Sequence, residues 1–210
     1  MTIADIAKAV APHGLIYMGA LREGSDTIVL IGAGPDMWPA FCASPEYHDR
    51  QRDPLDRWSK RLLTQVAKNY EAICEFPSDG PPFAPFIAWA KATRRFWQSP
   101  TGMLVHDQAG LMISIRGALR IPSRIDIPFS TSQNPCLTCA TKPCETACPV
   151  GALSGTTAYD VPVCMVYLRS SEGADCMENG CLVRRVCPVS QNFGRAPQQS
   201  GFHMRAFIGS

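Results

Sequence analysis

The chain has few charged residues and no long apolar run. Asp, Glu, Lys and Arg make up 18% of its 210 residues and apolar residues 46%, a balance typical of a globular protein and not of a disordered one. No stretch approaches the about 20 apolar residues that a membrane span needs. The N-terminus lacks the charged segment and following apolar segment of a secretory signal. We therefore expect a cytoplasmic protein with no membrane association of its own.

Cysteine, by contrast, is abundant and concentrated. Eight of the ten cysteines follow residue 135. They form the pattern Cys136-x2-Cys139-x4-Cys144-x3-Cys148-Pro149, then Cys164, then Cys176-x4-Cys181-x5-Cys187-Pro188. Eight thiolates are what two [4Fe-4S] clusters require. The other two, Cys42 and Cys74, are expected to be ordinary buried thiols.

The proline after two of the cysteines suggests how the ligands are shared. In two-cluster ferredoxins, the last cysteine of a run, the one before proline, ligates the other cluster. We therefore expect a first cysteine set of Cys136, Cys139, Cys144 and Cys187 for cluster one, and a second cysteine set of Cys148, Cys164, Cys176 and Cys181 for cluster two. Zinc knuckles and disulfides are the alternatives, but the crossing Cys-Pro pair has no role in a zinc site.

The segment from Pro135 to Ala152 resembles a bacterial-type two-cluster ferredoxin domain. The lone Cys164 and the final Cys187-Pro188 resemble the iron–sulfur half of the epoxyqueuosine reductase and reductive dehalogenase group. In that group a cobalamin-binding domain precedes the clusters. The resemblance implies an α+β chain in which residues 1–128 form a mixed α/β domain of cobalamin-reductase type. Residues 129–210 would form a ferredoxin-like domain with a C-terminal tail.

The chain departs from that group in three places. Its ligand spacings contain insertions, since x4 replaces the usual x2 before Cys144. Residues 94–100 lack the Gly-Trp-Ile-Gly-Lys type of stretch found in the family. Residues 188–210 leave no room for a tRNA-binding extension. These departures favour an electron carrier over a corrinoid-dependent reductase.

The first part of the chain predicts a compact mixed domain. Apolar periodicity and turn residues predict helices over 2–12, 53–74 and 84–97 and strands over 14–21 and 26–31. Two further strands, 102–105 and 111–121, are expected to pair around a His-Asp-Gln-Ala-Gly turn.

No residue outside the cysteine pattern stands out as catalytic. Asp79 lies roughly where the family has an acidic residue, but a surface turn is the better interpretation beside Gly80 and Pro81. His48, His106 and His203 are candidate axial or proton-relay groups, although single histidines are more often structural.

Basic residues gather at two places in the sequence. The first group is Arg50, Arg52, Arg57, Lys60 and Arg61, and the second is Lys91, Arg94 and Arg95. They are interpreted as solvated helix faces, with docking of an acidic redox partner as the alternative. With two clusters bound, the net charge would change from +2 to about −2. This negative charge argues against nucleic acid as a partner.

Three functions follow from the sequence. The first is an iron–sulfur protein that passes single electrons to a partner protein or bound cofactor. The second is a corrinoid-dependent reductase related to epoxyqueuosine reductase. The third is a zinc-stabilised interaction module.

Overall fold

The computed structural model describes residues 1–209 and has an α+β fold in two compact units. Unit one comprises Met1–Phe96 and Ser114–Ser132, and unit two comprises Trp97–Ile113 and Gln133–Ser210. The sequence analysis placed a single boundary at residue 128. The segment Trp97–Ile113 instead belongs with the cysteine-rich part of the chain, so each unit is built from two separate stretches.

Unit one contains an antiparallel sheet of four strands. Its strands, in spatial order, are β1 (Leu15–Glu23), β2 (Asp26–Ala33), β6 (Ile115–Ile121) and β3 (Ile73–Glu75). The expected hairpin of the first two strands is confirmed. The expected pairing of 102–105 with 111–121 is wrong, because β6 pairs with β2 and β3, where Ala118 and Leu119 are buried.

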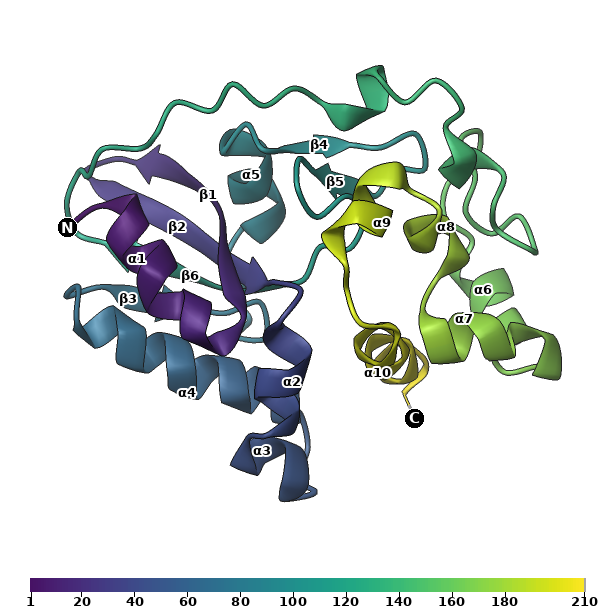
Figure 1. Ribbon diagram of the computed structural model, residues 1–210, viewed down its shortest axis with the longest axis horizontal. Coiled ribbons are helices and arrows are strands. Elements are labelled where there is room, and N and C mark those ends of the chain that lie inside the picture. The colour runs from purple at the N-terminus through teal and green to yellow at the C-terminus, as the bar shows by residue number, and fades with distance from the viewer. Residues whose placement is uncertain (210) are drawn as a thin grey trace. The chain divides into compact units, whose positions relative to one another are not determined.

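Helices cover both faces of this sheet (Figure 1). On one face, a Cβ atom at Gly117 would lie 2.7 Å from Leu63 of α4 (Pro54–Lys68). On the other, a Cβ atom at Gly19 would lie 2.7 Å from Thr93, which ends α5 (Phe86–Ala92). Glycine permits these close approaches. Because both faces are covered, β2 is buried along nearly its whole length and reads as a continuous apolar run.

The other helices of unit one are short. They are α1 (Ile3–Val10), the 3-10 helix η1 (Ala11–His13), α2 (Met37–Cys42) and α3 (Pro45–His48). Thr2 and Asp5 form a capping box that begins α1. The helix expected to end near Cys74 stops at Lys68, because residues 73–75 join the edge of the sheet as β3.

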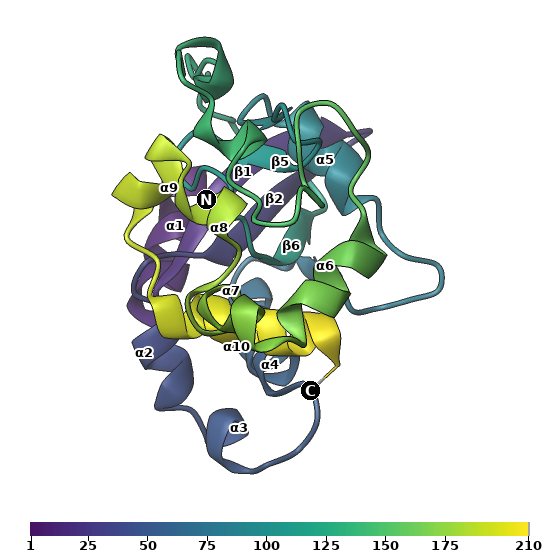
Figure 2. The ribbon, with the colours of Figure 1, turned by 90° about the vertical axis from the view of Figure 1, so that its right-hand side faces the viewer.

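Unit two contains short elements only. They are β4 (Phe96–Gln98), β5 (Leu104–His106), the 3-10 helices η2 (Pro135–Leu137), η3 (Pro143–Glu145) and η4 (Ser171–Gly173), and helices α6 (Val161–Leu168), α7 (Ala174–Asn179), α8 (Leu182–Arg185), α9 (Pro188–Phe193) and α10 (Pro197–Ile208). Strands β4 and β5 pair with each other. Helices α7 and α10 lie side by side (Figure 2). No helix within residues 1–209 has both the length and the apolar character to cross a membrane.

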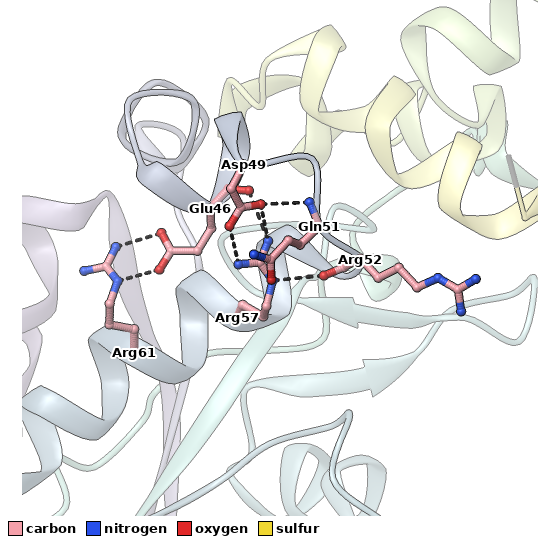
Figure 3. Close-up of polar contacts among 6 residues, drawn as sticks. All are labelled: Glu46, Asp49, Gln51, Arg52, Arg57 and Arg61. Carbon is pink, nitrogen blue, oxygen red and sulfur yellow. Dashed lines mark hydrogen bonds and ion pairs between the residues drawn. The ribbon is translucent and has the colours of Figure 1, made fainter.

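Two bidentate ion pairs hold α3 and the loop that follows it onto α4 (Figure 3). Arg57 donates to both carboxylate oxygens of Asp49 at 2.7 Å. Arg61 donates to the carboxylate of Glu46 at 2.5 and 2.9 Å, and the Glu46 side chain is only 10% exposed. Bidentate guanidinium–carboxylate pairs have the best geometry of the ion pairs in proteins. They fix α3 and this loop against the surface of α4.

These contacts account for much of the basic group predicted from the sequence. Arg57 and Arg61 are paired as above, and Lys60 is paired with Asp79. Three of the five cations of the first basic group are therefore neutralised within unit one. This pairing reduces the positive charge that an acidic partner would meet. Asp79 is half exposed in a surface turn, as the preferred interpretation expected.

We expect Glu46→Gln to lower the free energy of unfolding by about 1 kcal/mol at pH 7, the upper end for a partly exposed pair. The Arg61 guanidinium, which donates to the Glu46 carboxylate, lowers the pKa of Glu46. The stabilisation is therefore complete above the unfolded pKa of about 4.3 and is lost as the pH falls through the lower, folded value. Urea unfolding followed by tryptophan fluorescence measures it. Asp79→Asn, in an exposed pair, is the control and should change little.

Candidate functional site

Four cysteines line one cavity in unit two. Cys136, Cys139, Cys144 and Cys187 form part of the wall of a space of about 310 Å³. Val105 and Leu111, both buried, form another part. These four are the residues of the first cysteine set, brought together although Cys187 is distant from the others in sequence.

The remaining four cysteines line a second, smaller cavity. Cys148, Cys164, Cys176 and Cys181 surround a space of about 20 Å³. Its other walls are mainly apolar and include Leu153, Val183 and Met204 of α10. These are the residues of the second cysteine set. The two sets interleave in the sequence, since Cys148 belongs to the second and the later Cys187 to the first.

Prolines and helix starts place several of these thiols. Pro135 and Pro143 begin the 3-10 helices η2 and η3, and a cysteine follows each of them. Cys181 and Cys187 are the N-cap residues of α8 and α9, and Pro188 is the first residue of α9. Proline is favoured at the first helical position because its φ is already helical and its missing N–H is not needed there.

The thiols of each set interact electrostatically with one another. Burial, followed by the negative charges of Cys136 and Cys187, raises the pKa of Cys144 to about 11. Burial and then Cys187 and Cys139 raise the pKa of Cys136. These thiols therefore hold their protons at neutral pH. Metal ligation requires thiolates, so a metal would have to displace those protons.

In the second cysteine set, the pKa values of Cys164 and Cys181 are raised. Burial, then the charges of Cys148 and Cys176, raise the pKa of Cys164, against a lowering by a hydrogen bond from Tyr159. Burial also raises the pKa of Cys181, which the N–H groups of Arg184 and Val183 lower through hydrogen bonds. Donors of this kind stabilise charge on a ligand sulfur and tune the potential of a bound cluster.

The turn after β5 locks one wall of the first cavity to the helices that carry cysteines. Gly110 has φ +57°, and a Cβ atom there would lie 2.4 Å from Ser190 N. The N–H of Leu111 donates to Ser190 Oγ at 2.8 Å, and Arg184 Nη1 donates to the Leu111 carbonyl at 2.6 Å. Ser190 lies in α9 and Arg184 in α8. The turn and both helices therefore form one packed structure.

His106 belongs to this turn and has a structural role. It is fully buried, and its Nδ1 accepts the N–H groups of Gln108 and Ala109 at 3.3 and 3.1 Å. Its Nε2 lies 3.1 Å from the carboxylate of Asp107. Both ring nitrogens are engaged, so the expectation that His106 could be an axial ligand is not supported by its geometry.

The other candidate histidines lie elsewhere. His48 is exposed at the end of α3, edge-on to Tyr47, and His203 lies in α10 beside Phe202. Neither belongs to the walls of the two thiol cavities. Of the two other cysteines, Cys74 has a pKa raised to about 12 by burial and Cys42 one raised for the same reason.

The donor chemistry of both sets fits an iron–sulfur cluster, because each offers four thiols and apolar surroundings. The first cavity has room for a large inorganic group, whereas the second has room for about one water molecule. A cluster there requires its lining side chains to move apart. Within residues 1–209, no three His, Cys, Asp or Glu side chains, as they stand, form a group able to hold a metal ion. Cluster binding stays a prediction.

The sequence did not predict that residues 97–113 line the first cavity, nor that Tyr159 influences the pKa of Cys164. Val105 and Leu111 were assigned to the N-terminal domain, and no local signal links them to cysteines more than twenty residues away. Tyr159 stands in a Gly-Ser-Thr-rich loop. Only its position just before the helix of Cys164 could have drawn attention to it.

Comparison with models of known protein families finds no match for this chain, and comparison with curated proteins finds none either. The family resemblance described above therefore stays an expectation.

We expect Ser190→Ala to destabilise unit two by about 1–3 kcal/mol, because it leaves the buried N–H of Leu111 without its acceptor. The midpoint of thermal unfolding should fall by several degrees. Ser170→Ala is the control, since that hydroxyl is exposed and donates to the Tyr167 carbonyl. Equal midpoints for the two variants would contradict the assigned role of Ser190.

Proposed function

We propose that this protein is an electron carrier that holds two [4Fe-4S] clusters and passes single electrons to a partner protein or bound cofactor. The observation that carries the proposal is the grouping of eight cysteines into two cavities, four to each. The interleaving of the sets along the chain supports it further. Two crossed ligands are the arrangement of two-cluster ferredoxins.

The surroundings of the thiols also suit one-electron exchange. A single apolar cluster contains the buried residues Val105, Leu111, Leu153 and Val183, and cysteines of both sets pack against it. It would exclude water from the space around the clusters, which strengthens electrostatic control of their potentials. Cys144 and Cys176 are buried, and the other six cysteines of the two sets are partly exposed. The sites would thus be shielded, yet close enough to the surface for electron exchange.

When bound, each cluster supplies a centre that accepts or donates one electron. The role of the chain is to hold it by four thiolates, to donate hydrogen bonds to their sulfurs, and to keep the surroundings apolar. The N–H groups around Cys181, described above, are positioned for the second of these tasks.

Anaerobic reconstitution with iron and sulfide tests the proposal. We expect about eight irons and eight sulfides per chain, with broad absorption near about 400 nm that bleaches on reduction. The control is the same treatment with zinc. A colourless protein with stoichiometric zinc and no sulfide would overturn the proposal and favour the zinc-stabilised interaction module.

Replacement of one crossing cysteine tests the grouping. In Cys187→Ser, we expect loss of about half of the iron, because only the first cysteine set loses a ligand. Iodoacetamide labelling followed by mass spectrometry should then modify Cys136, Cys139 and Cys144 and spare the second set. Cys42→Ser, in unit one, is the control and should retain all iron. Labelling of Cys148 in place of Cys144 would show that the grouping is wrong.

The corrinoid-dependent reductase rests on the resemblance alone. The side chains of the described residues supply no observation that favours a corrinoid over another acceptor. A change in the spectrum of added cobalamin on binding, followed by its reduction through the clusters, would support that second function.

A further inference from the structure

Helix α5 is fixed to the sheet of unit one by one of its faces. Trp89 on this face is 3% exposed, and its Nε1 donates to the carboxylate of Glu23 at 2.9 Å. The guanidinium of Arg120 in β6 lies over the Trp89 ring, 5.6 Å from the ring centroid. Ile87 and Lys91 lie one turn apart on another face of α5, and both are exposed.

The loop before α5 also exposes apolar side chains. Residues 77–83 are all exposed and include two adjacent prolines and Phe83. The Phe83 ring lies against the backbone of Gly80, where a Cβ atom would be 2.5 Å from the ring. Phe83 is nevertheless 66% exposed, and Ile87 in the first turn of α5 is 65% exposed. An exposed group of apolar residues with a polar rim marks an interaction site.

Cations follow these apolar residues, and no acidic residue lies among them. Residues 80–95 contain Lys91, Arg94 and Arg95 and neither aspartate nor glutamate. The side chain of Arg95 lies over the ring of Tyr17 at 5.4 Å. Lys91 and Arg94 are exposed, and neither forms an ion pair with a carboxylate of residues 1–209. Two of the three cations of the second basic group therefore keep their charge at the surface.

We propose that residues 80–94 form a contact with an anionic lipid surface. Phe83 and Ile87 enter the headgroup region, and Lys91 and Arg94 meet the lipid phosphates. Segments that lie at a bilayer surface combine exposed aromatic and aliphatic side chains with Lys and Arg in this way. Lipid phosphates supply the negative charge that this segment lacks. The contact lies within unit one and is independent of the cysteine sets.

A lipid surface suits this segment better than a protein partner does. A stable protein interface buries about 800 Å² on each side and involves about 20–30 residues. Within residues 80–94, by contrast, Phe83 and Ile87 are the only large apolar residues that are exposed. A bilayer adapts to so small a projection, and each Lys or Arg near it strengthens binding about fivefold. The sequence predicted no membrane association because it has no apolar run of spanning length, but a surface contact needs no such run.

Sedimentation of the full chain with lipid vesicles tests the proposal. Wild-type protein should bind vesicles of equal parts phosphatidylglycerol and phosphatidylcholine, bind phosphatidylcholine alone much more weakly, and dissociate as salt is added. In the double variant Lys91→Gln, Arg94→Gln, the partition constant should fall about 25-fold, about fivefold for each cation. In Phe83→Ser, Ile87→Ser it should fall about tenfold or more, because the apolar contribution is lost.

Two variants outside the segment are matched controls. Ile73→Ser removes an apolar side chain that is 65% exposed, in a stretch that contains Glu71 and Glu75. Arg50→Gln, Arg52→Gln removes two exposed cations of the first basic group. Both should bind the anionic vesicles as the wild type does. The midpoint of thermal unfolding checks that each variant is folded.

Tryptophan fluorescence locates the contact. In Phe83→Trp, the anionic vesicles should shift the emission to shorter wavelength by more than they shift that of the wild type, because the new indole leaves water. An equal shift in both proteins would overturn the proposal, as would equal loss of binding in the segment variants and the controls. Retention of the wild type on immobilised polyglutamate without binding to vesicles would overturn it in favour of an acidic protein partner.

Discussion

The structure of unit two depends on a conflict between burial and charge at its thiols. Eight cysteines from separated parts of the chain converge in two places. Burial and the charge of neighbouring cysteines raise the pKa of Cys136, Cys144 and Cys164 there. In the first cavity the apolar walls of Val105 and Leu111 come from an earlier segment of the chain. Cysteines of both sets pack against the apolar cluster of this unit, so they are part of its core.

Unit one is stabilised by an apolar core around a sheet and by ion pairs. Its four-stranded sheet is covered on both faces, and the buried strand β2 supplies much of its core. Arginine–carboxylate pairs then fix α3 and the loop that follows it onto α4. Unit two has instead short helices and a small apolar cluster.

The sequence predicted local features well and long-range ones poorly. Pro54 marked the start of α4, and the two first strands followed from their alternation and turn. The rule about cysteine before proline predicted that Cys187 would group with Cys136, Cys139 and Cys144, and these four line one cavity. Their ligation of a cluster stays a prediction. The partner of β6 could not be predicted in this way, because the nearby strand 102–105 offered an equally good local turn. The placement of Val105 beside Cys144 likewise depends on packing between distant segments.

The division of each unit into two stretches limits which fragments of the chain contain a complete unit. The chain passes from unit one to unit two, back to unit one and again to unit two. No single cut therefore yields a complete cysteine-bearing fragment: a piece beginning at Gln133 carries all eight thiols but lacks β5 and the turn that anchors α8 and α9. Any contiguous fragment that includes both stretches of unit two also includes β6, an inner strand of the sheet of unit one.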